Sequence, residues 1–308
     1  MPTRSRNTDR GLVDAGKLLA TYAESLERQP LATRTRGAYM AQVSSFVSWL
    51  AASEHGALAL SEQRVRDSAV REYKRHVKTD RKWAPTSVNQ ALAAIDNFYR
   101  SLSLGRPDVA REDLPQLAPR SLDADDQRSL RRAVERCPSA RDRAIATVFL
   151  YTALRLSELG ALDLADMSMS ARRGRLKVRL GKGDAYREVP LNSACRAALE
   201  EWLIARADQL SKGQGAHVNH KALWLARSGR RLSTRAIDLV VRRLAADAGL
   251  ELSAHMLRHT CVTNLVRAGT DVVLVAELAG HRRLDTTRRY SLPSEADRDA
   301  AVEALVQT

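Results

Sequence analysis

Cysteine is scarce in this sequence, and its scarcity bears on two kinds of site. Cys137, Cys195 and Cys261 are odd in number, far apart and without the close pairs that zinc sites use. Their number and spacing argue against a disulfide framework and against a cysteine metal site. They fit a reducing compartment such as a cytosol.

Long apolar runs are also missing. The longest, at 144–154, is interrupted and much shorter than the roughly 20 residues that a membrane span needs. Residues 1–11 are basic and polar with no apolar stretch behind them, which is not the pattern of a signal peptide. We therefore expect a soluble cytoplasmic protein with no membrane partner.

Lysine is the third scarce residue, with eight lysines against 42 arginines. The 308 residues carry 50 Lys and Arg against 36 Asp and Glu, which gives a formal net charge of +14. An excess of this size favours a polyanionic partner, although a basic protein without a special partner has the same composition. The length suits two domains rather than one core. The Arg- and Ala-rich composition points to a high-GC bacterium.

The spacing of apolar residues predicts a mostly helical chain with one β-hairpin. Residues 175–191 alternate basic and apolar side chains around Gly181-Lys182-Gly183-Asp184, so Lys182 is expected at the hairpin tip. Residues 105–120 hold three prolines and no apolar period, as in a linker. Region 211–231 has no clear pattern. Helices are expected at about 11–28, 35–50, 61–78, 88–102, 144–154, 193–210, 233–248, 255–268, 271–279 and 294–306, and a further helix is expected to begin near Asp123.

Two arginines stand where packing explains them poorly. Arg155 ends the apolar run, and Glu158, three residues on, is the local partner that could orient it. Arg258 lies one helical turn from His255, so both face the same way. A guanidinium is always charged and binds two oxygens at once, so two arginines could neutralise a phosphodiester without a metal. A simple helix-end ion pair accounts for Arg155 equally well.

Lys182 and Tyr290 are suited to the chemistry of such a phosphodiester. A lysine with a lowered pKa can protonate a departing 5′-oxygen, which an arginine cannot, although a solvated turn lysine is the ordinary alternative. Tyr290 follows two arginines in a polar stretch with little to pack against, whereas the other six tyrosines fit packing roles. A phenol needs help to attack, and nearby positive charge and an accepting imidazole such as His255 would supply it.

Three histidines, His255, His259 and His281, raise the alternative of a zinc site. His255 and His259 have the i, i+4 spacing of a zincin helix, but Met256 stands where that pattern requires glutamate. The sequence therefore predicts no metal ligands, and His259 is expected to cap or pack its helix.

These motifs resemble those of the tyrosine recombinases, also called phage integrases or the λ-integrase family. The resemblance rests on TALRLSEL (152–159), GKGDAYREVPL (181–191) and HMLRHTCVTNLVRAGTDVVLVAELAGHRRLDTTRRY (255–290). TRTRGAYMAQVSSFVSWL (33–50) and TSVNQALAAIDNFYRSL (86–102) resemble helices of the family's core-binding domain. Nearly the whole chain is covered, least clearly at 211–231. Ala153 departs from the family, which often has glycine there.

The resemblance implies roles for particular residues. Tyr290 would attack the scissile phosphate, and Glu158 would support Arg155. The product would be a 3′-phosphotyrosyl enzyme and a free 5′-hydroxyl, made without metal, ATP or another cofactor. The residues that would activate the phosphate are Arg155, Lys182, His255, Arg258 and His281.

The resemblance also implies a fold and partners. The fold would be mainly α with a small β-sheet, forming a C-shaped DNA clamp. A four-helix, SAM-like core-binding domain (1–108) would be joined by a linker (109–120) to an α+β catalytic domain (121–308) that ends in helix 294–306. The partner would be double-stranded DNA with an inverted-repeat core site, bound by a homotetramer on two sites and by a monomer or dimer off DNA. Helix 294–306 would dock on a neighbour or pack on its own chain.

Basic residues that could contact DNA belong mainly to the helices of the first third, although solvated helix faces look alike. An accessory protein and the target sequence cannot be derived from the pattern. The candidates are Arg34, Arg36, Lys74, Arg75, Lys78, Arg81, Lys82 and Arg235.

Three functions are compatible with the motifs. The leading one is a site-specific recombinase, associated with the bacterial nucleoid, that integrates, excises or resolves a mobile element, plasmid or chromosome dimer. A type IB topoisomerase is disfavoured by the Xer-like length and by the core-binding helices. An inactive DNA-binding relative is disfavoured because every catalytic position is filled. The chain starts almost directly with the core-binding helices, so a simple recombinase without an arm-binding domain is expected.

Overall fold

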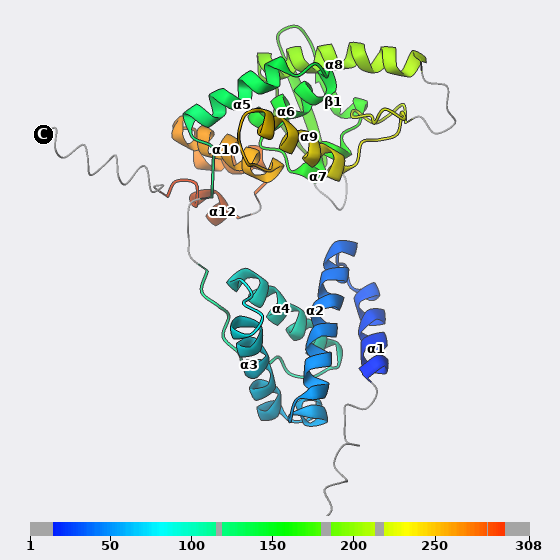
Figure 1. Cartoon of the computed structure of the whole chain (residues 1–308), viewed down its shortest axis with the longest axis vertical. Coiled ribbons are helices and arrows are strands. Elements are labelled where there is room, and N and C mark those ends of the chain that lie inside the picture. Colours follow the sequence, from blue (N-terminus) through cyan, green and yellow to red (C-terminus); the bar gives the residue numbers. More distant parts are fainter. Residues whose placement is uncertain (1–14, 115–118, 180–185, 213–218, 282, 293–308) are drawn as a thin grey trace, which may run out of the picture. The chain divides into compact units, whose positions relative to one another are not determined.

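A computed structural model describes residues 15–114, 119–179, 186–212, 219–281 and 283–292 (Figure 1). The chain divides into two compact units, Met1–Pro115 and Gln116–Thr308, and each is described by itself. Within the described ranges, no helix has both the length and the apolar character that a bilayer span requires.

The first unit is a bundle of four helices. They are α1 (Ala15–Arg28), α2 (Thr33–Ala52), α3 (Gln63–Thr79) and α4 (Pro85–Ser101), with a short 3₁₀ helix η1 (Gly56–Leu60) before α3. The four helices expected from the apolar spacing are present. Proline is tolerated at the first turn of α4 because the amide that it lacks has no partner within the helix there.

Aromatic side chains fill the core of this unit. Tyr22, Phe46, Tyr73, Phe98 and Tyr99 are all buried. The ring of Phe46 meets the edge of Tyr73 at a centroid distance of 5.1 Å, which is a favourable aromatic arrangement. Large buried rings supply much of the apolar area that a small helical bundle needs.

Residues 105–112 follow α4 and are bonded to the first unit. The side chain of Asn89 donates to the carbonyl of Glu112 and accepts from its amide, both at 2.8 Å. The Lys74 ammonium donates to the Ala110 carbonyl at 2.7 Å, and Asp67 accepts from the Asp108 amide at 2.9 Å. The part of the expected linker at 109–112 is therefore fixed to α3 and α4.

The second unit contains the small sheet and the remaining described helices. The helices are α5 (Ala124–Arg136), α6 (Ala140–Thr152), α7 (Leu156–Ala161), η2 (Leu164–Asp166), α8 (Ser193–Lys212), α9 (Thr234–Asp247), α10 (Ala254–Arg267), α11 (Val272–Ala279) and α12 (Leu284–Arg288). The side chains of Asp123, Ser139, Ser233 and Asp271 each accept a backbone amide at the start of a helix, which explains where α5, α6, α9 and α11 begin.

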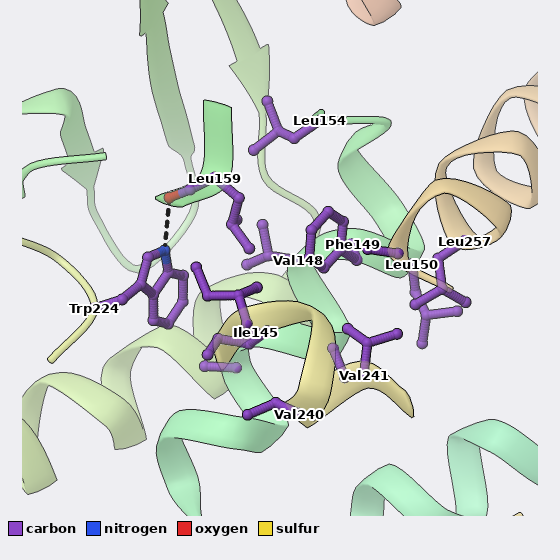
Figure 2. Packing of buried hydrophobic residues seen from close by; sticks show 14 of the residues in the cluster. Ile145, Val148, Phe149, Leu150, Leu154, Leu159, Trp224, Val240, Val241 and Leu257 are labelled. Atoms are coloured by element: carbon purple, nitrogen blue, oxygen red, sulfur yellow. Dashed lines mark hydrogen bonds between the residues drawn. The ribbon is translucent and has the colours of Figure 1, made fainter. Parts of the chain in front are cut away.

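Helix α6 runs through the core of this unit. Ile145, Val148 and Phe149 on α6 are buried, and other elements surround them (Figure 2). Residues 219–231, which show no clear pattern in the sequence, place Trp224 in the same core. The Trp224 indole donates to the Leu159 carbonyl at 3.0 Å (Figure 2). This segment therefore completes the core around α6.

The sheet is antiparallel in the order β1 (Met167–Met169), β2 (Gly174–Arg179) and β3 (Tyr186–Pro190). The strands β2 and β3 are those expected from the alternation, and β1 was not predicted. Val178 pairs with Arg187 and Leu176 with Val189, so these four residues share the buried face. The expected tip of the hairpin, with Lys182, lies outside the described residues.

Candidate active site

Segments that are far apart in the sequence meet at the C-terminal end of α6. Arg258 on α10 donates hydrogen bonds to the carbonyl of Ala153, which follows α6, and to that of Ala279 on α11, the latter at 2.7 Å. Arg155 donates to the carbonyl of Gly280 at 2.7 Å. Both arginines are thus held against the same turn at the end of α11.

Ala153 ends α6 with a left-handed backbone, φ 51° and ψ 22°. This conformation directs the chain away from the helix axis before Arg155 begins α7. Glycine adopts it without steric cost, whereas alanine pays a penalty of about 1 kcal/mol. The departure from the family pattern at this position therefore has a conformational cost but leaves the carbonyl available to Arg258.

Arg155 forms the expected ion pair with Glu158, with 2.7 Å between Nη1 and Oε1. The other carboxylate oxygen of Glu158 accepts the backbone amide of Arg155 at 2.8 Å and so caps α7. The Arg155 side chain remains 43 % exposed. It is therefore oriented from behind while part of its guanidinium stays accessible to an anion.

Arg187 on β3 belongs to the same site and was missed in the sequence. Its side chain is buried, and its two terminal nitrogens donate to the two carboxylate oxygens of Glu158 at 3.0 and 2.8 Å. Its Nε donates to the Leu278 carbonyl at 3.0 Å. The alternation of side chains along the strand predicts its position, because Arg187 is two residues from Val189 and therefore lies on the same face of the sheet.

Glu158 is thereby bonded to two arginines. Burial by itself would raise the pKa of its carboxyl group. The hydrogen bonds from Arg187 and from the Arg155 amide, with the positive charge of Arg187, outweigh burial and lower the pKa to about 2. Glu158 is therefore ionised at neutral pH and holds both guanidinium groups in place.

Arg258 is almost fully buried, with 3 % of its surface exposed. Burial and then the neighbouring charge of Arg155 lower its pKa to about 10. It is still protonated at neutral pH. Three guanidinium groups, those of Arg155, Arg187 and Arg258, therefore lie near the single carboxylate of Glu158. An anion such as a phosphate would relieve this concentration of charge.

His255, His259 and His281 lie around these arginines in different environments. The Nδ1 atom of His281 bonds to Oγ1 of Thr287, a fully buried residue of α12, at 2.8 Å. Burial, followed by the charges of Arg258 and Arg155, lowers the pKa of His281 to about 4. His255 is on an exposed part of α10, and partial burial with the same two arginines lowers its pKa.

Tyr290 is buried, with 7 % of its surface exposed, and packs with Ala153, Val262, Val275 and Ala279. The expectation that it has little to pack against is wrong. Helix α12 turns the polar chain back, so that residues Thr287 and Tyr290, three apart, both face inward. Burial raises the pKa of the Tyr290 phenol, and the charges of Arg258, Arg289 and Arg155 oppose this effect.

The imidazole that bonds to the Tyr290 hydroxyl is that of His259, through Nδ1, and not that of His255. The His281 ring stacks on the tyrosine ring at a centroid distance of 6.0 Å and an interplanar angle of 17°. His259 is therefore part of the site, beyond the packing role expected from the sequence. Among the described residues, no group of three or more His, Cys, Asp and Glu side chains could hold a metal ion.

The candidate DNA-binding residues fall into two groups. Arg34, Arg75, Arg81, Lys82 and Arg235 are exposed. Lys74 and Lys78, of which Lys78 is also exposed, form ion pairs with Glu112 at 2.7 and 2.8 Å, and Arg36 forms one with Glu27. Arg235 lies on the first turn of α9 in the second unit, and the others belong to the first unit.

Comparison with known proteins gives matches to both units. Residues 120–296 match the profile of the phage integrase family, and residues 18–106 match that of the phage integrase N-terminal SAM-like domain. The chain is 32% identical over 225 residues to tyrosine recombinase XerC of Roseiflexus castenholzii, which covers 69% of each protein. It is 39% identical over 215 residues to XerC of Azotobacter vinelandii, covering 67% of this chain and 69% of the relative.

Two solved structures have a similar fold. The XerH site-specific recombinase bound to its palindromic difH substrate, in a post-cleavage complex, gives a TM-score of 0.71 at 18% identity. The match covers 97% of this chain and 90% of that chain. A λ integrase dimer bound to a COC′ core site gives 0.64 at 14% identity, covering 89% and 94%.

Proposed function

The chain belongs to the phage integrase family and is a site-specific tyrosine recombinase that cleaves and rejoins DNA, and we propose that Tyr290 is its nucleophile. One observation carries this proposal: the Tyr290 phenol, two arginines and three imidazoles lie together at the end of α6. The phenol is a nucleophile, the arginines fit a phosphate, and the imidazoles can move protons.

In the cleavage step, Arg155 and Arg258 bind the non-bridging oxygens of the scissile phosphate. Tyr290 Oη then bonds to phosphorus as its proton passes to a neighbouring imidazole, and the bond from phosphorus to the 5′-oxygen breaks. Lys182 donates the proton that the departing oxygen needs, while His255 and His281 hydrogen-bond to the phosphoryl oxygens. The products are a 3′-phosphotyrosyl enzyme and a 5′-hydroxyl end.

The reverse step uses the same groups with another DNA strand. Its 5′-hydroxyl attacks the phosphotyrosine, and Tyr290 leaves. One phosphodiester is exchanged for another at each step, so neither ATP nor another energy source is required. Arginines bound to backbone carbonyls are oriented before the phosphate arrives, which lowers the reorganisation that the reaction demands.

We propose that two pairs of protomers act on two inverted-repeat sites and exchange strands through a Holliday junction. The segment 294–306, outside the described residues, would connect neighbouring protomers. The XerC relatives and the XerH complex with difH favour resolution of chromosome dimers as the biological role, with service to a plasmid or mobile element as the other outcome.

The test is a covalent-adduct assay on a nicked suicide substrate that carries an inverted repeat found near the gene. The protein is incubated with the labelled DNA in EDTA, and a protease-sensitive adduct is sought on a denaturing gel. Tyr290→Phe should bind the site and form no adduct. Tyr151→Phe, which removes the hydroxyl of an exposed tyrosine on α6, should form the adduct as the wild type does.

Two results would contradict the proposal. An adduct with Tyr290→Phe would show that another residue is the nucleophile. No adduct with the wild-type protein, on a site that it binds, would indicate a DNA-binding relative without strand-cleavage activity.

A further inference from the structure

The imidazoles of His259 and His281 contact Tyr290, and that of His255 contacts His259; the structure distinguishes among the three as acceptors of the phenol proton. His259 bonds to the hydroxyl directly through Nδ1, with 5.5 Å between the ring centroids. The Nδ1 atom of His281 is engaged by Thr287. The ring of His255 contacts His259 at a centroid distance of 4.1 Å, on the exposed side of α10. Of these three described histidines, His259 alone has a hydrogen bond to the reacting oxygen.

The charge states of the two partners fix the direction of this hydrogen bond. Burial, followed by the charges of His255, Arg258, Arg289 and His281, lowers the pKa of His259 to about 4, so its imidazole is neutral at neutral pH. The phenol keeps its proton because burial raises its pKa. A phenol is a stronger acid than a neutral imidazole N–H, so the hydroxyl donates and Nδ1 accepts.

We infer that His259 is the general base for Tyr290. As the bond between Tyr290 Oη and phosphorus forms, Nδ1 of His259 takes the phenol proton, and the 5′-oxygen leaves with a proton from a separate donor. In rejoining, the imidazolium returns its proton to the departing phenolate. This inference rests on the proposed function and assigns a proton-transfer role to a residue outside the set that activates the phosphate.

A phosphate bound in the site makes proton transfer from Tyr290 to His259 easier than it is in the site without DNA. His259 is a weak base without DNA chiefly because burial disfavours its protonated form. His255 and Arg258 on its own helix, and Arg289 and His281 in the chain after α11, further disfavour a positive charge there. A phosphate that binds Arg258 and Arg155 adds negative charge at the same place. The added charge offsets the repulsion and makes His259 more basic when the nucleophile must be deprotonated.

The experiment compares single-turnover cleavage by His259→Asn and the wild type on two suicide substrates. One carries the natural 5′-oxygen and the other a bridging sulfur, whose thiolate leaves without a proton. Asparagine can accept the phenol hydrogen bond but cannot take the proton. Cleavage by His259→Asn should fall roughly 100-fold or more on both substrates, as loss of general-base catalysis does. Lys182→Ala should be slow on the oxygen substrate and recover on the sulfur substrate.

Rejoining gives a second measurement. The phosphotyrosyl enzyme, formed over a long incubation, is supplied with a 5′-hydroxyl strand, and His259→Asn should rejoin more slowly by a similar factor. His255→Asn serves as a comparison from the same helix. His259→Gln provides a second variant if His259→Asn binds DNA more weakly than the wild type.

The outcomes separate the possible roles. Wild-type rates in His259→Asn would place the base elsewhere, and faster cleavage would mean that His259 restrains the phenol. If cleavage by His259→Asn recovered on the sulfur substrate, the role of His259 would be to protonate the leaving group and not to deprotonate the phenol. Each of these results overturns the inference while the wild-type adduct still supports the proposed function. Absence of the wild-type adduct would overturn the function itself.

Discussion

The two terminal nitrogens of Arg187 donate hydrogen bonds to the two carboxylate oxygens of Glu158, and both side chains are at least nine-tenths buried. A buried carboxylate that loses such a partner still carries the free-energy cost of desolvation but no longer has the ion pair that offset this cost. Glu158 also orients Arg155. Arg187 therefore acts through Glu158 on Arg155, which we propose to bind the phosphate.

Replacing Arg187 should affect both stability and cleavage. Arg187→Ala should lower the free energy of unfolding by about 3–5 kcal/mol, because it leaves a buried charge with one partner fewer. Arg187→Lys keeps the charge but not the two-pronged geometry, and should slow cleavage roughly 10- to 100-fold through misplacement of Arg155. Urea unfolding and single-turnover cleavage measure the two effects.

Arg175→Lys is the matched control for Arg187→Lys on the same sheet. Its ion pair with Glu188 is exposed, so the free energy of unfolding should change by less than about 1 kcal/mol and the cleavage rate should not change. Equal effects of the two lysine variants on cleavage would contradict a specific role for Arg187.

Gly280→Ala should disturb the same pair from the other side. Gly280 has φ +65°, and a methyl group there would lie 2.7 Å from Nη1 and 2.8 Å from Cζ of Arg187. Since Arg187 is held by Glu158 and by the Leu278 carbonyl, it would have to leave one of these partners. Cleavage should slow to a degree similar to that of Arg187→Lys.

Gly269→Ala separates backbone strain from this clash. Gly269 has φ +77° and open space around it, so alanine should cost about 1–2 kcal/mol of stability and leave cleavage intact. If both alanine variants cleave DNA at the wild-type rate, contact with Arg187 is not the reason for glycine at 280.

The low pKa of Glu158 predicts a specific acid sensitivity. The carboxyl group titrates near 4.5 in the unfolded chain and at about 2 in the folded protein. Its contribution to stability is therefore complete above about pH 4.5 and is lost as the pH falls toward 2. The decline in unfolding free energy across the upper part of this window should be shallower in Glu158→Gln than in the wild type. Parallel declines would show that Glu158 is not held in its ionised form.

DNA binding should respond differently to two kinds of basic residue. Arg34 and Arg235 are exposed, and loss of a phosphate contact from either should reduce the slope of log affinity against log salt by about 0.9. Lys74 is bound to Glu112 and to the Ala110 carbonyl, so Lys74→Ala should leave the slope unchanged. Fluorescence anisotropy over a range of salt concentrations measures these slopes. A reduced slope for Lys74→Ala would show that DNA displaces Glu112.

Local patterns in the sequence were sufficient for most of the fold. Capping residues and apolar spacing predict the longer helices but not the short helices α7, α12, η1 and η2, and strict alternation predicts β2 and β3. Strand β1 has three residues, too few for an alternation of their own, and exists because β2 offers it a partner. Such a strand depends on tertiary pairing that no local signal records.

The site was harder to derive where polar residues turn inward. Tyr290 looked exposed because its neighbours are charged, yet α12 buries it together with Thr287. The opposite error affects Tyr151 and Tyr186, which were expected to pack and are 39% and 48% exposed. In both cases, contacts between secondary-structure elements decide which side chains are buried. A turn made mostly of polar residues can still bury the side chains on one of its faces. Arg187 was overlooked because the sequence alone does not distinguish an arginine on the buried face of the sheet from the exposed arginines of the neighbouring strand β2.

The two arginines proposed to bind the phosphate take much of their orientation from the peptide backbone. The acceptors for Arg258 and Arg155 are the carbonyls of Ala153, Ala279 and Gly280, and every amino acid supplies a carbonyl. Apart from Gly280, side chains around these positions can therefore diverge over evolution while the guanidinium groups keep their positions, provided that the two turns are preserved. Substitutions near these carbonyls would then alter the packing of the unit and its preference for a DNA site before they alter the cleavage reaction.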